Sequence, residues 1–228
     1  MRYEPARHYT FSARLDCHYQ LGSPESIGPE TLLVVTLHGF GQTAEAMLPL
    51  TERMFGQQQL IASLEGPNQF FTDPKTLEVG FGWNTARHSE SRVRLHHEMV
   101  RHVLAEAGRE YGIPAERRIL VGFSQSVALN YRFVATLPNE VRGVVGICGG
   151  IPGDWARDSY KKVSAAVLHI ARRQDEIYPP AVTETYAEKL GTRASDVEFH
   201  LMEGGHHFPS RADGIVGRWL ERILRPAI

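Results

Sequence analysis

The segment RILVGFSQSVALNYRFVATLP, residues 118–138, joins a short apolar run, a turn of small residues and a helical pattern in direct succession. Residues 118–121 predict a strand and residues 122–126 a tight turn. Residues 127–137 resume apolar positions at helical spacing until Pro138 ends the pattern. This order of strand, turn and helix is the local signature from which the rest of the fold can be worked out.

The turn itself, Gly122-Phe123-Ser124-Gln125-Ser126, matches the pattern G-x-S-x-G in four of its five positions, because Ser126 replaces the last glycine. Small residues are needed where a strand passes so sharply into a helix, and the strained turn projects the Ser124 hydroxyl above the sheet. The amino end of the following helix favours negative charge developing near Ser124. Ser124 is therefore a candidate nucleophile, although the pentapeptide alone also fits an ordinary turn.

Outside this segment, strand-like and helix-like patterns alternate along the chain. Such alternation is typical of an α/β fold, in which a mostly parallel twisted sheet carries helices on both faces. One domain over residues 1–228 is expected. The predicted strands are 31–37, 60–64, 143–148, 165–171 and 197–202, and the predicted helices are 44–55, 92–111, 181–190 and 215–224.

The composition argues against several other classes of protein. Lys and Arg number 25 against 26 Asp and Glu, which gives a formal net charge of −1. The chain therefore lacks the excess of positive charge that would attract a nucleic acid. The longest apolar runs have the length of strands, which argues against stable insertion into a membrane. Residues 1–11 lack the apolar stretch of a signal peptide, and Cys17 and Cys148 fit free thiols, so a cytoplasmic location is expected.

Two further reactive residues follow later predicted strands. Asp175 lies on the loop after residues 165–171, and His206 lies on the loop after residues 197–202. A serine hydroxyl is a weak nucleophile that needs a base and a group to orient that base. Ser124, Asp175 and His206 occur in the chain order of an α/β-hydrolase triad, so their joint placement at strand ends favours a catalytic role.

The surroundings of such a site can also be outlined. The backbone N–H groups of Phe40 and Gln125 are candidates for an oxyanion hole, while the His38 ring is expected to be structural. The long 66–91 segment has no clear period and is expected to wall the site, whereas residues 149–164 leave no room for a cap domain. An open cleft with an apolar pocket is expected. The candidate aromatic residues there are Phe40, Trp83, Tyr178 and Phe208.

Four motifs together resemble the phospholipase/carboxylesterase family of α/β-hydrolases, which includes acyl-protein thioesterases and small bacterial carboxylesterases. The resemblance spans nearly the whole chain after about residue 30. It implies the α/β-hydrolase fold without a cap, and it maps the catalytic triad onto Ser124, Asp175 and His206 rather than His207. The motifs are LHGFGQ at 37–42, ILVGFSQS at 119–126, QDEIYPP at 174–180 and GGHHFP at 204–209.

The chain departs from the family pattern at two places. Ser126 replaces a glycine, and Ala171-Arg172-Arg173-Gln174 replaces a glycine-containing approach to the acid, which predicts cationic side chains beside the cleft. None of the three reacting residues is missing.

The expected function is a serine carboxylesterase that hydrolyses short- to medium-chain esters of small molecules through an acyl-enzyme, without a cofactor or a metal. Acyl-protein thioesterase or lysophospholipase activity is one alternative, since the same oxyanion chemistry serves thioesters. A non-catalytic α/β-hydrolase-fold binding protein is another. A metal-dependent hydrolase is disfavoured because the eleven histidines form no H-E-x-x-H motif. The oligomeric state is open, and a homodimer is one option.

Overall fold

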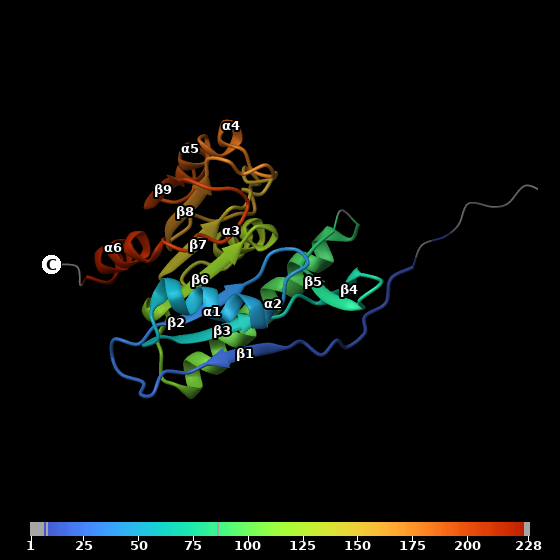
Figure 1. The fold of residues 1–228 in the computed structure, drawn as a ribbon, viewed down its shortest axis with the longest axis horizontal. Helices are drawn as coiled ribbons and strands as arrows, with labels where there is room; N and C mark the ends of the chain where they lie inside the picture. The colour runs from blue at the N-terminus through green and yellow to red at the C-terminus, as the bar shows by residue number, and fades with distance from the viewer. Residues whose placement is uncertain (1–6, 8, 86, 226–228) are drawn as a thin grey trace, which may run out of the picture.

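A seven-stranded sheet forms the centre of the computed structural model, which describes residues 7, 9–85 and 87–225 (Figure 1). The strand order is β1-β3-β2-β6-β7-β8-β9; β1 is antiparallel to β3 and the other neighbours are parallel. The predicted mostly parallel sheet is thereby confirmed. The strands are β1 (Tyr19–Gly22), β2 (Leu33–Leu37), β3 (Leu60–Leu64), β6 (Arg118–Phe123), β7 (Gly143–Ile147), β8 (Ala166–Arg172) and β9 (Val197–Met202).

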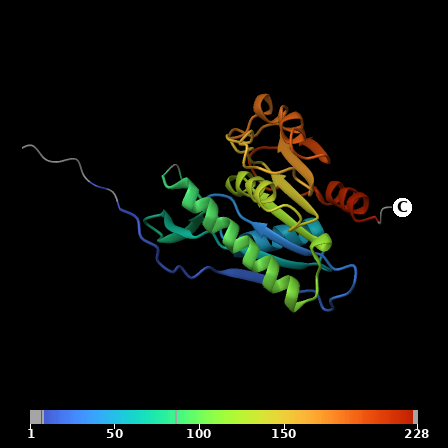
Figure 2. The ribbon, with the colours of Figure 1, turned by 180° about the vertical axis from the view of Figure 1, so that it is seen from behind.

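Helices cover both faces of this sheet. Helices α1 and α6 pack on one face, and α2, α3 and α5 pack on the other, which Figure 2 shows from behind. The predicted helix over 181–190 is instead two short helices, because the Thr185 hydroxyl donates to the Val182 carbonyl at the break. The helices are α1 (Ala44–Phe55), α2 (Ser89–Glu110), α3 (Gln125–Thr136), α4 (Pro180–Thr183), α5 (Tyr186–Gly191) and α6 (Asp213–Leu224).

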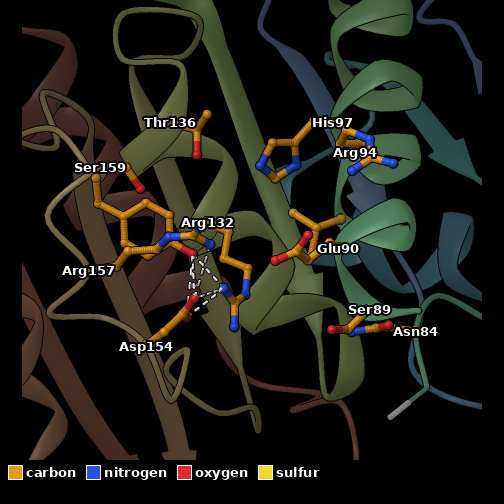
Figure 3. A pocket seen from close by; sticks show the side chains of 12 residues that line it. Asn84, Ser89, Glu90, Arg94, His97, Arg132, Thr136, Asp154, Arg157 and Ser159 are labelled. Atoms are coloured by element: carbon orange, nitrogen blue, oxygen red, sulfur yellow. Dashed lines mark hydrogen bonds and ion pairs between the residues drawn. The ribbon is translucent and has the colours of Figure 1, made fainter. Parts of the chain in front are cut away.

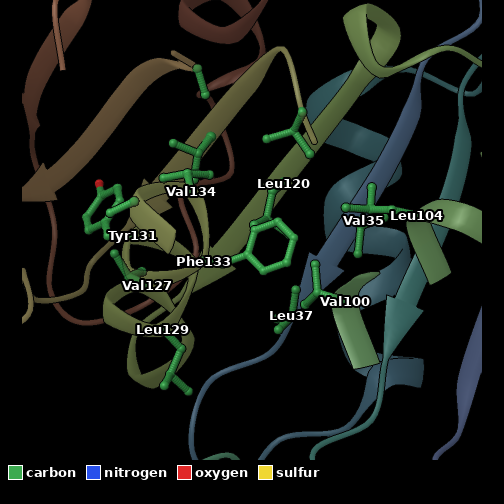
Figure 4. Close-up of a cluster of buried hydrophobic side chains, with 14 of the residues drawn as sticks. Val35, Leu37, Val100, Leu104, Leu120, Val127, Leu129, Tyr131, Phe133 and Val134 are labelled. Carbon is green, nitrogen blue, oxygen red and sulfur yellow. The ribbon is translucent and has the colours of Figure 1, made fainter. Parts of the chain in front are cut away.

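The apolar runs of the central strands are buried on both faces. Val35 and Leu120 point toward α2 and α3, where they pack with Phe133 (Figure 4), while Val34 and Ile119 belong to the cluster beneath α1 and α6. A strand covered on both faces needs apolar residues at every position rather than at alternate ones. Each such side chain contributes roughly 1.5 to 3 kcal/mol through burial. This core fixes the strand ends at which the candidate residues lie.

The 66–91 segment contains a hairpin that the sequence does not reveal. Strands β4 (Asn68–Asp73) and β5 (Glu78–Gly82) pair in antiparallel fashion, and most β4 side chains are exposed or half-buried. The Gly41 N–H donates to the Phe81 carbonyl at 2.8 Å, and the Phe81 N–H donates to Gln42 at 3.1 Å. The hairpin therefore braces the loop that follows β2, beside the predicted site.

The connection between β7 and β8 leaves the carboxyl edge of the sheet uncovered. Residues 148–165 are all described, and they form turns and one isolated bridge without a helix. This agrees with the expectation that no cap domain is inserted there. None of the helices in the described part of the chain is long and apolar enough to cross a membrane. Residues 1–6 and 8, on which the expectation about a signal peptide partly depends, lie outside the described residues.

Among the described residues, the side chains of His38, His96 and His169 are buried and that of His97 is partly buried. Burial lowers the pKa of His38 and of His97 to about 4, lowers that of His169 to about 3, and holds the pKa of His96 well below its ordinary value. The ring of His96 is fully buried between α2 and α3, where Nε2 lies 3.1 Å from Oδ1 of Asn130.

We expect the free energy of unfolding to fall steeply as the pH drops from about 6.5 toward 4. The unfolded chain takes up protons on these histidines near pH 6.5, whereas the folded chain does not until about pH 4, so stability rises with pH in this window. Each ring contributes at most about 1.4 kcal/mol per pH unit. Urea titrations at several pH values measure this slope, and His169→Gln should make it shallower. An unfolding free energy independent of pH in this range would contradict the prediction.

Candidate active site

The backbone turns from β6 into α3 at Ser124, whose φ of 54° and ψ of −112° are strained for a residue with a side chain. The Ser124 N–H donates to the Ile147 carbonyl of β7 at 2.9 Å. Little space surrounds this turn: a Cβ on Gly149 would lie 2.6 Å from the Ser124 carbonyl oxygen, and one on Gly122 would lie 2.7 Å from Asn130 Nδ2. The small residues of the motif therefore have the steric reason that the sequence suggested.

The structure brings the Ser124, Asp175 and His206 side chains together. Nε2 of His206 lies 2.9 Å from Ser124 Oγ, and Nδ1 of His206 lies 2.9 Å from Asp175 Oδ2. The carboxylate of Asp175 is buried, and its Oδ1 accepts the N–H groups of Ile177 at 2.9 Å and Tyr178 at 2.8 Å. These bonds hold the carboxylate in one orientation, which in turn fixes the imidazole with Nδ1–H toward the acid and Nε2 toward the hydroxyl.

His207 takes a different direction from its neighbour. Its Nε2 accepts a hydrogen bond from Nη2 of Arg172 at 2.9 Å. The Arg172 side chain is buried beneath Gly204, so it supports the loop that carries the histidines and does not stand in the cleft. The predicted cationic side chain beside the cleft is therefore wrong for Arg172. Arg173 is exposed and pairs with Glu203 at 3.0 Å.

The two backbone N–H groups predicted for an oxyanion hole come from two different segments at the ends of neighbouring strands. The N–H of Gln125 is the first of α3, and the N–H of Phe40 lies in the loop after β2. Within the described part of the chain, neither N–H donates to another group of the protein. The Gln125 side chain is firmly held, because Oε1 accepts from the Trp83 N–H and Nε2 donates to the Asn84 carbonyl, both at 2.8 Å.

The loop after β2 rests on two buried rings. His38 places Nδ1 2.7 Å from the Gly39 carbonyl oxygen and accepts the Gly66 N–H on Nε2 at 2.9 Å, which confirms its predicted structural role. The Trp83 indole donates from Nε1 to the His38 carbonyl at 2.9 Å and is fully buried. The expectation that the Trp83 side chain lines the cleft is therefore wrong. A tryptophan at the end of the hairpin packs inward because its N–H finds a buried carbonyl there.

The other predicted aromatic residues differ in exposure. Phe40 is 61% exposed and stacks on Phe70 with ring centroids 4.8 Å apart. Tyr178 is half-buried, and its ring centroid lies 5.8 Å from that of His206. Phe208 packs partly into the core cluster beneath α1 and α6. Phe70 belongs to the 66–91 segment that is expected to wall the site but is not among the individually predicted aromatic residues, because its place against Phe40 depends on the hairpin that carries β4.

A polar groove of about 400 Å³ lies between α2, α3 and residues 154–160 (Figure 3). It begins at Asn84, which is hydrogen-bonded to Gln125 beside the candidate nucleophile. Arg132 crosses it and pairs with Asp154 at 2.7 Å. Sequence reasoning missed this groove because its walls come from segments that are far apart in the chain.

Residues 24–216 match the model of a family described as phospholipase/carboxylesterase. Solved structures of similar fold include the carboxylesterase of Bacillus cereus, with 17% identity and a TM-score of 0.72 over 91% of this chain and 94% of that one. Esterase PE8 has 22% identity and a TM-score of 0.71 over 92% and 100% of the two chains. SOBER1 of Arabidopsis thaliana has 18% identity and a TM-score of 0.69 over 86% and 100%.

The fold and the match over residues 24–216 define an α/β-hydrolase without a cap domain. The chain belongs to the phospholipase/carboxylesterase family, and it is a serine hydrolase with the carboxylesterase activity of that family. The resemblance drawn from its four motifs is thereby confirmed.

A buried thiol lies close to the candidate acid. Cys148 follows β7 with a φ of 46°, and its Sγ lies 3.7 Å from the His207 carbonyl oxygen. Burial raises the pKa of the Cys148 thiol to about 12, and the negative charge of Asp175 acts in the same direction. A thiol in this state is a poor nucleophile, so Cys148 does not compete with Ser124.

We expect Cys148 to resist thiol reagents in the folded protein. At about pH 8 a thiol of ordinary pKa reacts readily, but a pKa of about 12 leaves almost no thiolate. Ellman's reagent should therefore label Cys148 of a Cys17→Ser variant only after denaturation. Rapid labelling of this variant without denaturant would contradict both the burial and the raised pKa.

Proposed function

We propose that this hydrolase cleaves short- to medium-chain carboxylic esters of small molecules through an acyl-enzyme formed on Ser124. The observation that carries the proposal is the unbroken chain of hydrogen bonds from Ser124 Oγ through His206 to Asp175. The distance from His206 Nε2 to Ser124 Oγ and that from His206 Nδ1 to Asp175 Oδ2 are both 2.9 Å. A base within hydrogen-bond reach of a hydroxyl, oriented by a buried carboxylate, is the arrangement that activates a serine.

In the first half of the reaction, Nε2 of His206 takes the proton from Ser124 as Oγ attacks the ester carbonyl carbon. The carbonyl oxygen becomes an oxyanion, and Asp175 stabilises the imidazolium that forms. The tetrahedral intermediate collapses when His206 returns the proton to the alcohol oxygen and the carbon–oxygen bond breaks. Water then attacks the acyl-enzyme by the same route, releasing the acid and restoring the Ser124 hydroxyl.

We assign the oxyanion hole to the backbone N–H groups of Phe40 and Gln125. Support comes from their lack of other acceptors among the described residues and from the position of Gln125 at the amino end of α3. Each such donor is worth about 3 kcal/mol in the transition state, because it meets charge that is absent from the ground state.

The substrate preference follows from the surroundings of Ser124. The connection between β7 and β8 contains no helix that would cover the site, which favours an open site. The exposed Phe40 and the half-buried Tyr178 offer apolar surface of limited extent. Phe208 is a further candidate contact from the histidine loop. These features suit a short or medium acyl chain. A thioester or a lysophospholipid would pass through the same chemistry, and a cytoplasmic location and a homodimer stay predictions from the sequence.

We expect Ser124→Ala to lower kcat/KM on p-nitrophenyl esters by about 10⁴-fold or more, because no nucleophile remains to form the acyl-enzyme. The assay runs from acetate to laurate, and wild-type activity should be greatest toward the shorter chains. Circular dichroism establishes that the variant is folded. Turnover retained by the folded variant would rule out Ser124 as the nucleophile, and no wild-type turnover on any ester would favour a binding protein.

Matched substitutions distinguish the two adjacent histidines. His206→Gln should lower kcat by about 10⁴-fold because the base is lost, whereas His207→Gln should change kcat by less than about tenfold. The difference follows from geometry, since His206 faces Ser124 and His207 faces Arg172. The reverse ranking of the two variants would assign the base to His207.

A further inference from the structure

Ser126, which occupies the place of a family glycine, makes contacts that a glycine could not. The side chain is fully buried at the second position of α3. Its Oγ accepts the Phe123 N–H at 3.0 Å and donates to the Leu37 carbonyl at 2.9 Å, with the Phe123 carbonyl at 3.0 Å as a second acceptor. One hydroxyl therefore contacts two different strands.

These contacts lie where the two central strands separate. The parallel pairing of β2 with β6 ends at the pair Leu37 and Gly122. Directly beyond this pair, the Ser126 hydroxyl lies between the Phe123 N–H and the Leu37 carbonyl and bonds to both. The side chain therefore bridges the ends of the two strands where their backbone pairing has ended.

Each strand end carries one of the proposed oxyanion donors. Leu37 is followed by the loop that contains Phe40, and Phe123 is followed by Ser124 and Gln125. A second connection between the same two loops runs through the Gln125 side chain and Trp83 to the His38 carbonyl. Two independent links therefore hold the loop after β2 against the turn, and Ser126 forms the one that lies inside the sheet.

We propose that Ser126 is a positioning residue that sets the spacing between the Phe40 and Gln125 N–H groups, and so tunes the oxyanion hole. The inference rests on the proposed function, because it requires Ser124 to be the nucleophile. Oxyanion donors act at about 2.7 to 3.1 Å, and a misplacement of about 1 Å can cost 100-fold in rate. The second link limits the displacement, so removal of the hydroxyl costs less than loss of a donor.

The test compares Ser126→Ala with a matched control on the p-nitrophenyl ester that the wild type cleaves best. The expected result is a fall in kcat of about tenfold with KM unchanged within about twofold. A trifluoromethyl ketone that adds to Ser124 mimics the tetrahedral oxyanion, so its Ki should rise by the same factor.

Ser63→Ala is the control, because Ser63 is also fully buried and donates to one carbonyl, that of Ala44, at 2.8 Å. It should lose comparable stability in urea without a change in kcat or Ki. Titration with a fluorophosphonate counts the folded active sites in every sample. Ser126→Gly, which restores the residue of the family pattern, is the second variant and should show the same fall in kcat. It keeps the proposal testable if Ser126→Ala does not fold.

Equal kcat and Ki values for Ser126→Ala and Ser63→Ala per titrated site would overturn the positioning role. A rise in the KM of Ser126→Ala without a change in its kcat would overturn the positioning role as well, since it would indicate that Ser126 contacts the substrate. Failure of the proposed function gives a different result, because Ser124→Ala then stays active. If Ser124→Ala is inactive but Ser126→Ala keeps the kcat and Ki of the wild type, only the role of Ser126 is rejected.

Discussion

The strained backbone of Ser124 is the constraint around which the rest of the site is arranged. A residue with a φ of 54° and a ψ of −112° persists only where its surroundings over-determine it. Here the hydrogen bond to Ile147, the start of α3 and the contact with Gly149 do so together. The packing of the central strands offsets this strain, so the geometry of the proposed nucleophile depends on the hydrophobic core.

Parallel pairing explains why three residues so distant in sequence meet at this turn. The carboxyl ends of β6, β8 and β9 lie at one edge of the sheet, so the loops after them carry Ser124, Asp175 and His206 to the same region. The sheet alone does not set the orientation of the imidazole. That depends on the two backbone N–H groups that hold the Asp175 carboxylate from the following turn.

The parts of this arrangement that the sequence predicts are those governed by local pattern and chain order. Contiguous apolar runs mark buried strands, and the small residues at 122–126 mark the turn. The direction of a side chain depends on partners that no local pattern reveals. Trp83 turns inward to a carbonyl, Arg172 turns under Gly204, and His96 finds Asn130 on another helix. Each partner comes from a distant segment, so composition and spacing could not assign these three.

The two glycine positions of the G-x-S-x-G pattern, which are occupied here by Gly122 and Ser126, differ in the space that the fold leaves for a side chain. At Gly122 a Cβ would press against Asn130, so the position has no room for a side chain. At position 126 a hydroxymethyl group fits, and its oxygen finds a donor and an acceptor at 2.9 to 3.0 Å. A glycine there would leave the Phe123 N–H and the Leu37 carbonyl without this shared partner. The pattern is therefore a steric requirement at its first position, whereas at its last position a small polar side chain can add a restraint on the turn that carries Ser124.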